Sequence, residues 1–207
     1  HKTFFGTQRG VGAADMAEED PSYALWEAVE RRTFPGAVSN HHLGTLVGLL
    51  MAAYEMNAFR DTYQGQVLAN AKAFARALHG EGLPVAGDPA VDYTETHQVV
   101  VEVGYGRGVE AARRLEESNI IVNYQASPRE EGFTAAGSLR LGVSEMTRFG
   151  MTEKDFGELA GLLAAVVLRG RDVRDEAVRL RGRFRDLHYC FSDAELEGRL
   201  AALEDLG

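Results

Sequence analysis

Two side chains in this sequence have the type and the setting that amino-acid chemistry needs. The first is Lys2, which follows His1 and precedes a glycine-containing turn at what the pattern indicates is a strand end. A lysine amine is a useful nucleophile only when it is neutral, which requires burial or a nearby positive charge. The small residues after it leave space for a flat cofactor. From the residues alone, a solvated lysine near a chain end is the commoner case, and it stays open as the alternative.

The second is Arg140, which stands between two leucines in the run SLRLG at positions 138–142. Alternation along a strand points its side chain to the face opposite that of its neighbours. A guanidinium in that position can bind a carboxylate through two parallel hydrogen bonds. The alternative is an arginine on an edge strand that faces water, which the residues alone favour.

Two other groups of residues, a histidine pair and a run of arginines, are expected to have structural roles and not to bind a metal or a nucleic acid. His41 and His42 are adjacent at an expected helix start, so they point in different directions, and no carboxylate lies at ligand spacing. The sequence therefore predicts no metal site. The arginines between positions 169 and 185 alternate with acidic residues, which predicts a solvated, salt-bridged helix face.

Composition and charge limit the possible partners. The chain has 207 residues, of which 45% are hydrophobic and 26% charged, and its formal net charge is -9. Nucleic acids and anionic membranes attract positive surfaces, so we expect neither as a partner. The one cysteine, Cys190, excludes an internal disulfide and suits a reducing cytoplasm. The apolar runs are shorter than the roughly 20 residues of a membrane span. No signal peptide is visible. Because the chain opens without methionine, we expect it to be processed, truncated or only the ordered part of a longer protein.

The elements that must position Lys2 and Arg140 follow from apolar spacing and from helix-breaking residues. Helices are predicted from Pro21 to the break at 34–36, then over 43–56, 60–79, 109–118, 152–168, 172–185 and 192–203. The helix over 43–56 is apolar nearly all round and is expected to be buried. Strands are predicted over 98–103, 120–122 and 138–142. This alternation indicates an α/β or α+β protein in two parts.

Several short segments, in a shared order, resemble the C-terminal half of serine hydroxymethyltransferase and its relatives. These enzymes use pyridoxal phosphate and have the aspartate-aminotransferase fold (fold type I). The resemblance covers residues 1 to about 190. The segments that carry it are HKTFFG at 1–6, FPG at 34–36, YQGQVLANAKAFARA at 63–77, NIIVN at 119–123, SLRLG at 138–142 and SEMTRFG at 144–150.

The resemblance implies a role for each candidate residue. Lys2, beside His1, would hold pyridoxal phosphate as a Schiff base, and Arg140 would bind the substrate carboxylate. The loop with Gly36, Ser39 and Asn40 would contribute phosphate contacts across a dimer interface. The implied fold is α/β: residues 1–58 would end the large cofactor-binding domain, 59–83 would form a linking helix, and 84–207 would form a small α+β domain.

The resemblance also implies an activity and partners. The expected reaction is aldol-type cleavage and transfer on β-hydroxy amino acids, with an amino acid and an aldehyde as small-molecule partners. The enzyme would be a cytoplasmic homodimer with shared active sites, and it would need an N-terminal half that supplies the groups around the cofactor ring. A non-catalytic dimerising fragment or pseudoenzyme is the alternative from another class.

Departures from the family pattern leave the use of tetrahydrofolate open. The family usually has a Lys-Asn pair where this chain has Tyr124-Gln125, and that asparagine is a typical folate contact. The family also usually has arginine where this chain has Gln8. The larger Tyr124 is expected to narrow the folate slot. These changes make a folate-independent threonine transaldolase or aldolase the alternative reaction.

Overall fold

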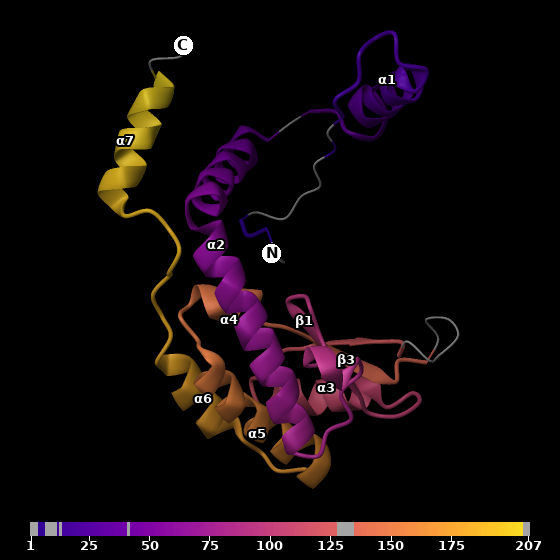
Figure 1. Ribbon diagram of the computed structural model, residues 1–207, viewed down its shortest axis with the longest axis vertical. Coiled ribbons are helices and arrows are strands. Elements are labelled where there is room, and N and C mark those ends of the chain that lie inside the picture. Colours follow the sequence, from indigo (N-terminus) through magenta and orange to yellow (C-terminus); the bar gives the residue numbers. More distant parts are fainter. Residues whose placement is uncertain (1–3, 7–11, 13, 41, 128–134, 205–207) are drawn as a thin grey trace. The chain divides into compact units, whose positions relative to one another are not determined.

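The computed structural model describes residues 4–6, 12, 14–40, 42–127 and 135–204. The chain forms two compact units (Figure 1). Unit 1 contains Thr3–Met56 and unit 2 contains Asn57–Gly207. Each unit is described by itself.

Unit 1 begins its regular structure with α1 (Tyr23–Arg31), as the apolar spacing predicts. A π-helical turn, η1 (Arg32–Ala37), follows, and it contains the expected break: Phe34 and Pro35 have non-helical backbone angles and are joined by a cis peptide bond. None of the residues in α1 or η1 is buried.

The long helix α2 (Leu43–Gly80) replaces the two predicted helices. It runs without interruption through 57–59, because no glycine or proline there breaks the backbone pattern. The prediction that 43–56 is buried is wrong for this chain, since Leu43, Leu46 and Val47 are all exposed. An apolar surface on a helix shows that burial is favourable, but burial also needs a second surface that covers it.

Unit 2 is built on a three-stranded antiparallel sheet in the order β1-β3-β2. The strands are β1 (Gln98–Glu102), β2 (Asn123–Gln125) and β3 (Ser138–Gly142). The prediction of the first strand is confirmed to within one residue, and that of the third has the observed bounds. The predicted strand at 120–122 is wrong by three residues. Ile120 instead closes the preceding helix, because its N–H donates to the Leu115 carbonyl at 2.8 Å.

The core of unit 2 lies on one face of the sheet. Val99 and Val101 of β1 and Leu139 and Leu141 of β3 are buried there. The helix α3 (Gly108–Glu117) packs on β2, β3 and α5 (Glu153–Arg169), and α5 packs on α6 (Arg174–Gly182). The remaining elements are η2 (Pro89–Val91), α4 (Ser144–Arg148) and α7 (Asp193–Glu204).

Two local features fix the ends of helices in unit 2. The Thr152 N–H and hydroxyl both donate to the Asp155 carboxylate, at 3.0 and 2.8 Å, in the predicted capping box of α5. At the start of α3, a Cβ on Gly108 would lie 2.6 Å from the Ala136 carbonyl oxygen and 3.0 Å from that of Ser138. Only glycine allows this close approach of helix and strand.

Among the described helices, none combines the length and the apolar content that crossing a membrane requires.

Candidate functional site

Arg140 lies on β3, which is the central strand of the sheet and not an edge strand. In the antiparallel register it pairs with Val100 of β1 on one side and with Asn123 of β2 on the other. Residues directly opposite one another in such a pair share a face of the sheet. Arg140 and Asn123 therefore lie on the face opposite the buried leucines of β3.

Arg140 is half-buried, and no hydrogen bond or ion pair joins its guanidinium to any other residue in the described part of the chain. A half-buried cation without a partner is unfavourable, whereas a carboxylate that binds it forms two charge-assisted hydrogen bonds. Arg140 and Asn123 also border a cavity of about 490 Å³. This volume lies in the range of pockets that hold small molecules.

On the neighbouring strand β2, Gln125 and Tyr124 lie on opposite faces of the sheet. Gln125 pairs with Ser138, two residues before Arg140, so the Gln125 amide lies on the Arg140 face. Tyr124 pairs with Leu139 and lies on the other face. Alternation along β2 thus directs the Tyr124 side chain away from the Arg140 face, and the expectation that Tyr124 narrows the folate slot stays a prediction. The faces on which Tyr124 and Gln125 lie can be assigned only once the register of β2 against β3 is known.

The end of the Arg140 strand is held by a buried tyrosine of α2. The Tyr63 hydroxyl donates to the carbonyl oxygen of Ser144, two residues after β3, at 3.0 Å. Burial raises the pKa of this hydroxyl above its ordinary value of 10.0. The group therefore stays protonated, and remains a donor, over the ordinary pH range. Sequence analysis did not identify Tyr63 as a site residue, because an apolar helix face gave no signal of what its hydroxyl meets.

The loop with the predicted phosphate contacts lies in unit 1. Gly36 belongs to η1, where a Cβ would lie 3.2 Å from the Arg31 carbonyl oxygen, and Ser39 and Asn40 follow on an exposed segment. The Ser39 hydroxyl, the Asn40 amide and backbone N–H groups are donors of the kind that a phosphate accepts. These three residues lie together on one segment, and Arg140 belongs to the other unit.

The remaining candidates are the two at the start of the chain and the histidine pair. His1 and Lys2 lie outside the described residues, as does His41. His42 is exposed beside the start of α2. The described residues contain no group of three or more histidine, cysteine, aspartate or glutamate side chains that could hold a metal ion.

Comparison with known proteins gives consistent results. Residues 2–163 match the family described as serine hydroxymethyltransferase. The serine hydroxymethyltransferases of Korarchaeum cryptofilum and Archaeoglobus fulgidus are 42% and 40% identical to this chain over 201 residues. Those matches cover 93% and 94% of this chain but only 45% and 44% of the relatives. The chain therefore spans less than half the length of the curated relatives it matches.

A solved structure is similar over nearly the same range. The crystal structure of L-threonine transaldolase from Pseudomonas fluorescens is 30% identical, with a TM-score of 0.76, and the likeness covers 91% of this chain and 43% of that one. These matches confirm the predicted fold class: a helix-rich α/β fragment of an enzyme of the aspartate-aminotransferase type.

Proposed function

Because the chain belongs to the serine hydroxymethyltransferase family, we propose that it supplies the carboxylate-binding part of an enzyme that cleaves and transfers β-hydroxy amino acids with pyridoxal phosphate. The observation that carries the proposal is the half-buried Arg140 on the central strand of the unit 2 sheet, which has no hydrogen-bond or ion-pair partner among the described residues. It supplies the group that a substrate α-carboxylate needs, within a chain that is about 40% identical to hydroxymethyltransferases.

The residues present fit the cofactor. Gly36, Ser39 and Asn40 offer neutral hydrogen-bond donors on one segment, which is the chemistry that a phosphate group requires. We propose that Lys2, beside His1, holds the cofactor covalently. When bound, pyridoxal phosphate supplies an electron sink for the pair released as the bond between Cα and Cβ breaks.

The proposed task of Arg140 is to orient the substrate. Two parallel hydrogen bonds from its guanidinium fix the plane of the carboxylate, and thus the directions in which the other bonds of Cα point. Holding the Cα–Cβ bond in one direction determines which bond breaks. The β-hydroxyl loses its proton, its oxygen forms a double bond to Cβ as the Cα–Cβ bond breaks, and Cβ leaves as the carbonyl carbon of an aldehyde. Cα then takes up a proton to give glycine or forms a new bond to the carbonyl carbon of a second aldehyde.

A second reaction is supported by one observation, the likeness to L-threonine transaldolase. We propose it as the alternative: the complete enzyme would use threonine and pass the glycine unit to an aldehyde without tetrahydrofolate. Tyr124 lies on the sheet face opposite Arg140, whereas Gln125 keeps an amide on the Arg140 face. Product formation from threonine or serine, with and without tetrahydrofolate, separates the two reactions. Strict dependence on folate with serine as the efficient donor would exclude the transaldolase.

The rival from another class is a non-catalytic dimerising fragment. Within the part of the chain that the structure describes, Arg140 is half-buried without a hydrogen-bond or ion-pair partner. A scaffold does not require such an arginine, so Arg140 argues against this rival. We further propose that the complete enzyme is a cytoplasmic homodimer with shared active sites. In it, 1–58 would complete the cofactor domain, 59–83 would form the linking helix and 84–207 would form the small domain.

Substitution of Arg140 tests the proposal in the complete enzyme. Arg140→Ala should weaken amino-acid binding by about 2–5 kcal/mol, because a buried charge pair tolerates truncation poorly, and it should leave cofactor binding intact. The matched control is Arg113→Ala, which removes an exposed arginine of α3 that is paired with Glu110 and Glu117. Equal amino-acid affinity in the Arg140 variant and the wild type would exclude the carboxylate role.

A second substitution tests the cofactor lysine. Lys2→Ala should abolish the covalent attachment of cofactor that borohydride reduction traps. A reduced adduct at another lysine would exclude Lys2 as the residue that holds the cofactor.

A further inference from the structure

Two buried polar side chains of α2 reach the segment that follows the Arg140 strand. Tyr63 and Asn70 are seven residues apart, close to two helical turns, so they lie on the same face of α2. Tyr63 is 1% exposed, and its hydroxyl donates to the Ser144 carbonyl oxygen at 3.0 Å. Asn70 is 0% exposed, and its amide nitrogen donates to Thr147 Oγ1 at 2.9 Å and to the Met151 carbonyl oxygen at 2.8 Å.

The hydrogen bonds around Asn70 use all of its polar atoms. Both amide hydrogens are donated, and Oδ1 accepts from Gln66 Nε2 at 2.9 Å. The Thr147 hydroxyl, which accepts from Asn70, donates in turn to the Val143 carbonyl oxygen at 2.8 Å. Leaving any of these buried polar groups unpaired is costly, so this arrangement has few alternatives of similar energy. We call Tyr63, Asn70 and Thr147 the α2–α4 seam.

The seam fixes the end of the strand that carries Arg140. Val143 and Ser144 follow β3 directly, and their carbonyl oxygens are the ones that Thr147 and Tyr63 hold. The Val143 N–H also donates to the His97 carbonyl oxygen, just before β1, at 3.1 Å. The backbone three and four residues after Arg140 is therefore tied both to the sheet and to α2.

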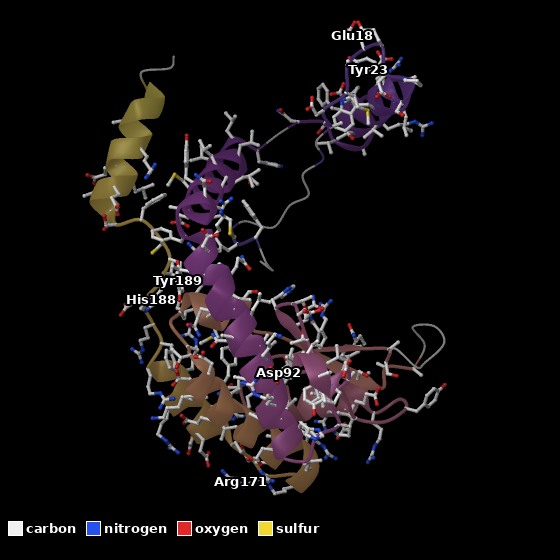
Figure 2. All side chains as sticks on the ribbon, viewed as in Figure 1. Glu18, Tyr23, Asp92, Arg171, His188 and Tyr189 are labelled. Atoms are coloured by element: carbon white, nitrogen blue, oxygen red, sulfur yellow. The ribbon has the colours of Figure 1, made fainter. Side chains whose placement is uncertain are left out.

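The segment after α6 contacts the α2–α4 seam at Tyr63 and at the end of α4. The Tyr189 ring lies 5.2 Å from the Tyr63 ring, and the His188 N–H donates to the carbonyl oxygen of Arg148, the last residue of α4, at 2.7 Å. Phe191 lies 5.6 Å from Phe59, one turn earlier on α2. Figure 2 shows His188 and Tyr189 beside α2, on the segment that leads to α7.

From these contacts we infer that Tyr63 and Asn70 are positioning residues for carboxylate binding by Arg140. Neither is placed against the substrate. They act through the backbone of 143–151, which sets where β3 ends and thus where the guanidinium lies. The inference rests on the proposed function, because it presumes that Arg140 binds the substrate carboxylate.

The experiment compares two ligands that differ at the carboxylate, glycine and glycinamide, in the complete enzyme with cofactor. Tyr63→Phe removes the hydroxyl and keeps the ring against Tyr189, and Asn70→Asp keeps the shape and removes the amide donors. Each should lower the ratio of glycine to glycinamide affinity roughly three- to tenfold, the effect of about one hydrogen bond. The KM for the amino-acid substrate should rise by more than kcat falls. If Asn70→Asp fails to fold, Tyr63→Phe alone decides.

Controls separate positioning from stability and from the proposed function itself. Leu78→Ala removes a fully buried side chain two turns further along α2 and leaves the seam intact. It should lower stability without changing the ratio. An equal change of ratio in Leu78→Ala, or an unchanged ratio in both seam variants while Arg140→Ala abolishes the discrimination, would overturn the inference. An unchanged ratio in Arg140→Ala would instead refute the carboxylate role on which it rests.

Discussion

Units 1 and 2 contain helices with similar sequence patterns but very different burial. In α1, the apolar residues share one face, and yet none of its residues is buried. In α3, which is about as long, Ala111, Ala112 and Leu115 are buried against the sheet and α5. Within the described ranges, the buried apolar residues of unit 1 are Phe5 and Ala52, and all the others belong to unit 2.

The comparison separates two kinds of information in a sequence. Apolar periodicity states which side chains share a face, and both helices carry that signal. Burial depends in addition on a second element that covers the apolar face. For α3, the sheet and α5 cover that face, and both belong to unit 2. Unit 2 thus has a core of its own, whereas Leu25 of α1 and Leu43 of α2 remain 68% and 67% exposed.

The largest expected effect comes from separating the units. Residues 57–207 alone should unfold cooperatively, with a midpoint close to that of residues 1–207, because they retain nearly all the buried apolar side chains. Residues 1–56 alone should show no cooperative transition. Circular dichroism during urea titration checks both fragments. Loss of the transition in 57–207, or a cooperative transition in 1–56, would contradict the assignment of the core to unit 2.

A smaller effect is expected from a matched pair of leucine substitutions. Leu115→Ala in α3 should lower the free energy of unfolding by about 2–5 kcal/mol, since it removes a fully buried side chain. Leu25→Ala in α1 should change it by less than about 0.5 kcal/mol, because that side chain is exposed. Denaturant titration of the two variants measures the difference. Similar losses would mean that α1 is packed as tightly as α3.

The smallest effect concerns the helix starts. Thr152→Ala should cost about 1 kcal/mol, because it removes the side chain from the capping box of α5. Ser22→Ala should cost much less, since the Ser22 side chain makes no capping bond at the start of α1. A shift in the denaturation midpoint without a change in slope is the expected signature. An equal cost at Ser22 would show that α1 is capped in solution.

Much of unit 2 could be predicted from local signals. The β-branched run at 98–103 and the alternation in SLRLG mark the two longer strands, and Thr152 with Asp155 marks the start of α5. The strand predicted at 120–122 was displaced because Ile120-Ile121-Val122 has high strand propensity, whereas the pairing of β2 with β3 begins only at Asn123.

The candidate site was less predictable. The type and neighbours of Arg140 mark it as a possible carboxylate ligand, but its place on the central strand follows from the order of strands. That no described residue pairs with it follows from the tertiary structure. The roles of Tyr63 and Asn70 depend on what approaches α2 from about 80 residues further along the chain. No local pattern contains such distant contacts. The roles of Lys2, Gly36, Ser39 and Asn40 stay predictions.

The close approach at Gly108 has a consequence for how this sequence can diverge. Alanine is the smallest step away from glycine, and it would place a carbon 2.6 Å from the Ala136 carbonyl oxygen, on a rigid backbone that cannot swing aside as a side chain does. Val109, next to it, is exposed and has room to vary. The structure thus excludes a side chain at Gly108 and leaves room for one at the adjacent Val109. A substitution at Gly108 would therefore require a shift of the backbone at 136–138, which leads into the strand that carries Arg140.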